Sequence, residues 1–110
     1  MQSYKIQEIR EAWVQCELYR KLVELGYYVQ PEYVVQLKKR RLRADLAVFK
    51  GDKFIAFIEV KNHNNKVRGI KKEGAQYKKY LETGARFVYC LHKDDIDSTI
   101  AVINAWSDNL

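Results

Sequence analysis

The sequence is poor in several features that would place a protein in a special class. It has two cysteines and one proline, no internal repeat, and no apolar run near the length of a membrane span. Cys16 and Cys90 lie far apart without a Cys-x-x-Cys spacing, so we expect two buried free thiols, not a zinc site or a disulfide. The polar start Met1-Gln2-Ser3-Tyr4-Lys5 is unlike a signal peptide. These absences predict a cytoplasmic protein with no membrane partner.

The composition that remains is that of one globular domain. The chain has 110 residues, of which 47% are hydrophobic and 31% charged, so we expect a single domain over 1–110. Its formal net charge is +6. Two basic clusters carry the excess, one at Lys38, Lys39, Arg40, Arg41 and Arg43, the other at Lys66, Arg68, Lys71 and Lys72. Such clusters can be ordinary solvated surface, but their place on both sides of an unusual apolar segment favours a polyanion partner.

Apolar periodicity and glycine positions predict an order of seven elements. A long helix over 5–25 should end at Gly26, and a second, over 69–83, should end at Gly84. The second helix should turn its stripe of Ile70, Gly74, Tyr77 and Leu81 inward and its lysines outward. Strands are expected at 27–36, 42–50, 53–61 and 86–91, with a last helix capped by Asp97 or Ser98. The order is αβββαβα, an α/β (α+β) fold with a central sheet between helices.

The unusual segment is the hairpin within 43–62, RADLAVFKGDKFIAFIEVKN, where three charges interrupt an apolar pattern. Asp45, Glu59 and Lys61 are costly to bury unless they are paired or bind something charged. Residues two apart on a strand share a face, so Glu59 and Lys61 point the same way. If Asp45 lies opposite Glu59, the three charges gather at one end of one face.

That register makes further predictions about the hairpin. It places Ala47 opposite Phe57 and Phe49 opposite Ile55, and it requires a three-residue loop or a two-residue turn with a bulge. Phe57 and Ile55 then share the face of the charges. The opposite face should be wholly apolar, with Ala44, Leu46, Val48, Ala56, Ile58 and Val60.

Two carboxylates with nearby carbonyl and water oxygens are suited to a hard cation such as Mg²⁺. A protonated lysine is no ligand, but it can position or activate water and offset charge on a phosphorane-like transition state. The alternative is a buried Asp-Lys-Glu salt-bridge cluster with no ligand. The apolar context and the basic flanks favour a site.

The spacing of Asp45, thirteen residues and then Glu59-Val60-Lys61 resembles the PD-(D/E)xK nuclease superfamily, although Ala44 stands where a proline is usual. Within it the chain is most similar to the N-terminal nuclease domain of type I restriction enzyme R subunits and their stand-alone relatives. The segments that carry this likeness are EAWVQCELYRKLVELGYYV, RADLAVF, IEVKN and the Gln-x-x-x-Tyr motif of Gln76 and Tyr80.

The resemblance implies a restriction-endonuclease-like fold, with an αβββαβ core and a mixed central sheet flanked by helices. It also implies a metal-dependent DNA nuclease that uses Mg²⁺, with Mn²⁺ able to substitute. It implies that Asp45, Glu59 and the Val60 carbonyl hold the metal and that Lys61 serves the attacking water. Gln76 and Tyr80 would support the site. Many members of the superfamily add a helical carboxylate, for which Glu17 is the first choice, with Glu11 and Glu24 left open. The residues expected to contact DNA are Lys38, Lys39, Arg40, Arg41, Arg43, Lys66 and Arg68.

Two alternatives stay open at this stage, a structure-specific resolvase of the Holliday-junction type and an inactive DNA-binding module of the same fold. The chain has no Gly-rich Lys-Ser/Thr phosphate loop, so a translocating motor or another subunit would have to be supplied separately. One constellation cuts one strand, which favours a homodimer on duplex DNA. Trp13 and Trp106 are expected in the core and not at such a contact.

Overall fold

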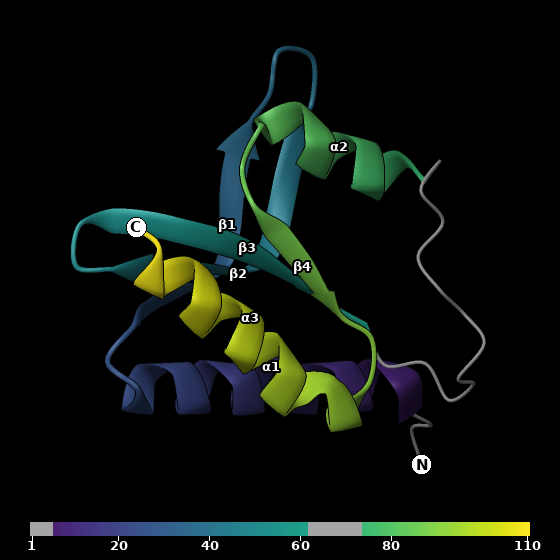
Figure 1. Cartoon of the computed structure of the whole chain (residues 1–110). Helices are drawn as coiled ribbons and strands as arrows, with labels where there is room; N and C mark the ends of the chain where they lie inside the picture. The colour runs from purple at the N-terminus through teal and green to yellow at the C-terminus, as the bar shows by residue number, and fades with distance from the viewer. Residues whose placement is uncertain (1–5, 62–73) are drawn as a thin grey trace.

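The structure is a computed structural model that describes the backbone of residues 6–61 and 74–110. Its elements follow the predicted order αβββαβα (Figure 1). They are α1 (Ile6–Glu24), β1 (Tyr28–Gln36), β2 (Arg41–Lys50), β3 (Lys53–Val60), α2 (Ala75–Thr83), β4 (Phe87–Cys90), a short 3₁₀ turn (Lys93–Asp95) and α3 (Ile96–Asp108). The two predicted glycine stops are confirmed, since Gly26 and Gly84 have φ of 95° and 68°.

The four described strands form one mixed sheet in the order β1-β2-β3-β4. Strand β2 is antiparallel to both β1 and β3, and β4 runs parallel to β3. Helices α1 and α3 lie together below the sheet in Figure 1, and α2 lies on its other side. Pro31 falls on the edge strand β1, where the missing N–H of a proline does least harm. The sheet is therefore covered on both faces, as its apolar strands predicted.

The β2–β3 hairpin has the predicted register at its centre and a bulge near its turn. Ala47 pairs with Phe57 as expected. The register shifts between Val48 and Phe49, however, so that Phe49 pairs with Phe54 instead of Ile55. The alternative of a two-residue turn with a bulge is thus the one that occurs. Because Ile55 is the extra residue, it packs with the core on the α1 and α3 side and not beside Phe57.

The predicted division of β2 into two faces is wrong at Ala44. Ala44 packs with Leu42 under α2, whereas Leu46 packs on the α1 and α3 side. The reason lies in β1, where Glu32 has a left-handed φ of 52° opposite this point of β2. A left-handed residue breaks the two-residue alternation of a strand, so the two strands change faces here together. Asp45 lies at this change of face.

The inward face of α2 differs from the prediction by one residue. Tyr80 is fully buried, while Leu81 is 55% exposed and Tyr77 is half-buried. Tyr80 stacks on Phe87, with ring centroids 5.1 Å apart and planes 18° apart. Aromatic packing against β4 thus sets the rotation of the helix. Ile70 and the predicted start of this helix lie outside the described residues.

The first helix buries a narrower stripe than its composition suggested. Val14, Leu18 and Leu22 are fully buried against the sheet. Trp13 is 52% exposed and Cys16 is exposed too, so the expectation that both would be buried is wrong. A four-residue repeat points one line of side chains at the sheet, and the neighbouring apolar positions face outward.

At the other end of the chain, Trp106 packs against the core as predicted, and Cys90 is a buried free thiol. Helix α3 begins at Ile96, so its cap is Asp95 and not Asp97 or Ser98. The hydroxyls of Ser98 and Thr99 instead donate to the Asp95 carbonyl. No helix in the described ranges combines the length and apolar character that crossing a bilayer would need.

Candidate active site

Asp45 and Glu59 come together where β2 and β3 separate. Within the described residues, the paired ladder between these strands ends at Leu46 and Ile58. Beyond this last pair, the Val60 N–H donates to Asp45 Oδ2 at 2.7 Å. The carboxylate therefore takes the place of a strand partner and fixes its own position against β3. A charge-assisted bond of this kind is about twice as strong as a neutral one.

Asp45 is held from its other side by Gln15 of α1. The Gln15 Nε2 donates to the backbone oxygen of Asp45 at 3.0 Å. Sequence reasoning missed this residue. The available signal was a polar side chain beside the buried positions Val14 and Leu18, because such a residue needs a partner in the sheet beneath.

Glu59 is almost completely buried, with 2% of its side chain exposed. The Tyr80 hydroxyl donates to Glu59 Oε1 at 3.4 Å, and Lys61 Nζ lies 3.8 Å from Glu59 Oε2. The structure thus brings four of the predicted catalytic residues, Asp45, Glu59, Lys61 and Tyr80, into one group. Their chemical roles stay predictions.

Burial raises the pKa of Glu59 to about 9, with the hydrogen bond and the charge of Asp45 adding to the effect and Lys61 opposing it. The distance to Lys61 suggests an ion pair with a charged Glu59, and the raised pKa indicates a protonated one. We favour the protonated form for the metal-free chain at neutral pH. A carboxylic acid can donate to Asp45, whereas two adjacent buried carboxylates would repel each other.

This arrangement suits a divalent cation. In the metal-free chain, Asp45 and Glu59 share one proton, because two negative charges this close together repel each other. A divalent cation would replace that proton and neutralise both carboxylates. The donors predicted for it are the carboxylate oxygens of Asp45 and Glu59 with the carbonyl of Val60, a hard set that suits Mg²⁺ or Mn²⁺. In the described part of the chain, no three or more His, Cys, Asp and Glu side chains are grouped so that they could hold a metal ion together. The fit therefore rests on two carboxylates and backbone oxygen.

The helical carboxylate expected at Glu17 is engaged elsewhere. Glu17 and Glu24 both pair with Arg20, at 2.8 Å each, along the outer side of α1. Arg20 accordingly lowers the pKa of Glu17 by its hydrogen bond. Glu11 is half-buried and lies one turn before Gln15, on the face of α1 that reaches Asp45. Of the three glutamates, Glu11 is thus the one on the side of the site, and a ligand role for Glu17 stays a prediction.

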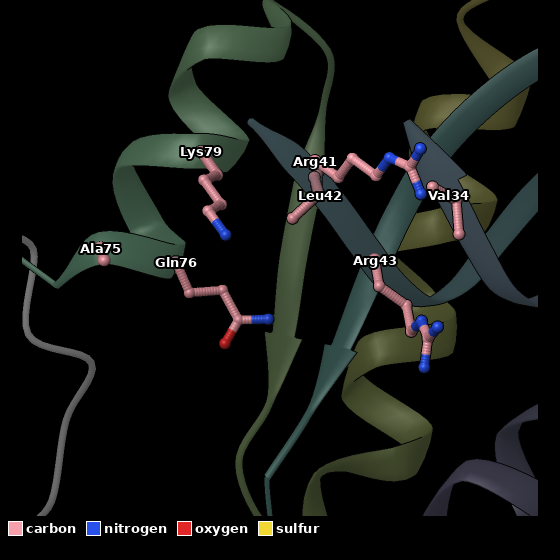
Figure 2. Close-up of a pocket in the computed structure, with 7 residues that line it drawn as sticks. All are labelled: Val34, Arg41, Leu42, Arg43, Ala75, Gln76 and Lys79. Atoms are coloured by element: carbon pink, nitrogen blue, oxygen red, sulfur yellow. The ribbon is translucent and has the colours of Figure 1, made fainter. Parts of the chain in front are cut away.

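The two members of the Gln-x-x-x-Tyr motif have different surroundings. Burial, together with the charge of Glu59, raises the pKa of Tyr80, which keeps this phenol a neutral donor. Tyr89, the strand partner of Glu59 on β4, has its pKa raised to about 12, mainly by burial. The Gln76 side chain makes no hydrogen bond to the described residues and lies in the pocket between α2 and β2 (Figure 2). Its support of the site stays a prediction.

The expected DNA contacts fall into four groups. Lys38 and Lys39 are exposed in the turn between β1 and β2. Arg40 is bound to Glu82 of α2, with its two guanidinium nitrogens 2.7 and 3.1 Å from one carboxylate oxygen. Arg41 and Arg43 are exposed on β2. Lys66 and Arg68 lie outside the described residues.

The comparisons with known proteins bear on the fold. No protein-family model matches the sequence, and no curated protein matches it either. Among solved structures, one described as a "VRR_NUC domain" is similar, with a TM-score of 0.58 and 22% identity over 84% of this chain and 95% of that one. A likeness at this identity concerns the backbone. The chain has a mixed four-stranded sheet with flanking helices, the restriction-endonuclease-like fold expected from its sequence.

Proposed function

We propose that this chain is a Mg²⁺-dependent nuclease that hydrolyses phosphodiester bonds in DNA. The observation that carries the proposal is the pairing of half-buried Asp45 with buried Glu59 at the point where β2 and β3 separate, with the Lys61 ammonium beside Glu59. The fold, the basic surface and the likeness to a "VRR_NUC domain" support the same function. We also propose the cytoplasm as its compartment.

The side chains divide the work between them. Asp45, Glu59 and the Val60 carbonyl would hold the metal ion, which when bound supplies Lewis acidity for the scissile phosphate and its water. Asp45 is held in place by the Val60 N–H and Gln15, and Glu59 by Tyr80. The ammonium of Lys61 can orient a water and offset the negative charge that grows on the phosphate. Arginines and lysines of β2 and its turn would contact the DNA backbone.

The first prediction tests the activity itself. Purified protein should convert supercoiled plasmid to nicked or linear forms in MgCl₂ or MnCl₂, and not in EDTA. Asp45→Asn should reduce this rate by at least about 100-fold, because the amide lacks the charge that a metal ligand and transition-state stabiliser supplies. Gel assays on plasmid, linear duplex, single-stranded and four-way-junction DNA would measure it.

A matched control is Asp52→Asn, which makes the same change in the exposed hairpin turn at the far end of β2 and β3. The control should cleave like the parent chain. Cleavage that persists in Asp45→Asn at the parental rate would contradict the proposed function, and so would equal cleavage in EDTA.

Three more specific assignments of the type of protein differ in their support. A type I restriction-like nuclease rests on the sequence segments, and a motor or further subunit would then act with it. A structure-specific resolvase is the second candidate, and preferential cleavage of the four-way junction would favour it. An inactive DNA-binding module is disfavoured, because the raised pKa of Glu59 marks a site that is costly to keep without a ligand.

The second prediction concerns self-association. A single site cuts one strand, so paired cuts in duplex DNA are most simply made by two copies. The exposed side chains of Trp13 and Val23 on α1, Leu25 just after it and Tyr28 on β1 offer apolar area for such a contact. Light scattering should therefore give a dimer mass, and Trp13→Glu should return the chain to the monomer. Leu81→Glu on α2 is the control, and a monomeric parent that still makes linear plasmid in one step would contradict pairing.

A further inference from the structure

A pocket of about 410 Å³ lies between α2 and the end of β2 nearest the β1–β2 turn (Figure 2). On the strand side its walls come from β2 and the adjacent residue Val34 of β1. On the helix side they come from the first turns of α2. The residues that line it are Val34, Arg41, Leu42, Arg43, Ala75, Gln76 and Lys79.

The lining is cationic on both walls. It contains two guanidinium groups, one ammonium group and one amide, and no carboxylate. The acid of α2 nearest to this strand end, Glu82, is already bound to Arg40. That ion pair also ties the β1–β2 turn to α2, so it holds the two walls together. A pocket with donors and uncompensated positive charge is suited to an anion with several oxygens.

The polar groups of this pocket are largely available to a ligand. In the described part of the chain, the side chains of Arg43, Gln76 and Lys79 have no hydrogen bond or ion pair, and the guanidinium of Arg41 is bonded only to Gln36. Figure 2 shows Lys79 and Gln76 extending from α2 toward β2, with the two arginines leaving the strand on the other side of Leu42. Long arginine side chains at a strand edge can close on a ligand seated between strand and helix.

Both walls of the pocket lead to the carboxylate pair. Along β2, Arg43 precedes Asp45 by two residues, which is roughly 7 Å of extended chain and close to the spacing of adjacent phosphates in a nucleic-acid strand. Along α2, Gln76 lies one turn before Tyr80, whose hydroxyl contacts Glu59. An anion in the pocket would therefore lie beside the site and not inside it.

We propose that this pocket binds a backbone phosphate of the DNA strand next to the one that is cleaved. The inference rests on the proposed nuclease function and deepens it. Arg43 and Lys79 supply the charge from opposite walls, and Gln76 donates from its amide. The pocket fixes where the strand lies relative to Asp45 and Glu59, which assigns Lys79 a role that its place among the surface lysines of α2 did not indicate.

The test is the salt dependence of binding to a fluorescent 20-base-pair duplex, measured by anisotropy in EDTA so that no metal takes part. Each phosphate contact contributes about 0.9 to the slope of log K against log salt. The double variant Arg43→Gln and Lys79→Gln should flatten this slope by roughly 1.8, and Lys79→Gln alone by about 0.9. The control double variant Lys50→Gln and Lys78→Gln removes the same charge from exposed positions outside the pocket and should change the slope by much less.

Equal flattening in the two double variants would overturn the pocket, and so would an unchanged slope or a parent chain that does not bind DNA. The melting temperatures of all variants should match the parent, since these side chains are at most half-buried. Because this assay contains no metal, it is separate from cleavage. If the salt slope flattens as expected but the parent chain shows no Mg²⁺-dependent hydrolysis, the phosphate pocket stands and the nuclease proposal fails. If the parent chain hydrolyses DNA but the slope is unchanged, the nuclease proposal stands and the phosphate pocket fails.

Discussion

Replacing Lys61 with alanine should lower the rate of DNA hydrolysis by at least about 100-fold and leave the fold and DNA binding close to those of the parent. The Lys61 ammonium lies 3.8 Å from Glu59 and is 37% exposed, so its removal deletes a charge at the site without opening a core cavity. A group that stabilises charge growing on the phosphate matters in the transition state more than in the bound substrate. The substitution should therefore lower the rate at which bound DNA is cleaved, and not the affinity for DNA.

Single-turnover cleavage at saturating protein would measure that rate, and anisotropy would measure binding on the same DNA. Lys53→Ala is a suitable control, because Lys53 is an exposed lysine at the opposite end of the same strand. Lys61→Arg adds a second test, since arginine keeps the charge but changes its shape and donor geometry. We expect it to recover only part of the rate. A fully active Lys61→Ala protein would remove Lys61 from the mechanism.

Much of this fold could be predicted because its signals are local. Gly26 and Gly84 mark the helix ends, and the two-residue alternation of the hairpin set the central register of Ala47 and Phe57. The same alternation put Asp45, Glu59 and Lys61 on one face. What failed depends on contacts distant in sequence. The left-handed Glu32 on β1 changes the face of β2 at Asp45, and the stacking of Tyr80 on β4 sets the rotation of α2.

The surroundings of Asp45 and Glu59 were harder to predict than the grouping of these two side chains with Lys61. Helix α1 carries apolar side chains on nearly all sides, so its sequence could not show which polar residue meets the sheet. The structure shows that Gln15 does, through the Asp45 carbonyl, and that Glu17 pairs with Arg20. The basic residues from Lys38 to Arg43 likewise looked like one DNA-binding cluster in the sequence. In the structure Arg40 is paired with Glu82, while Arg43 lines the pocket. Charge counts carry no information on such pairing.

Replacing Glu59 with glutamine should abolish cleavage and, in the absence of metal, make the folded chain more stable at alkaline pH. The folded chain keeps a proton on Glu59 up to a pKa of about 9, whereas the unfolded chain releases it near 4.5. Between these values unfolding releases a proton, so the free energy of unfolding of the parent chain should fall as pH rises. The fall is about 1.4 kcal/mol per pH unit while the proton is held. A glutamine has no proton to lose.

Thermal melting in EDTA from pH 5.5 to 8.5 would measure this difference. The parent should lose roughly 10 °C or more across the range, and Glu59→Gln should stay much flatter, with its advantage largest at pH 8.5. Glu24→Gln, at an exposed position of α1, should follow the parent. Added MgCl₂ should raise the melting temperature of the parent at pH 8.5 and not that of Glu59→Gln, because a cation stabilises the deprotonated pair. Parallel pH profiles for the parent and Glu59→Gln would show that Glu59 is charged when folded, and the carboxyl pair would then be an ordinary ion-pair cluster with Lys61.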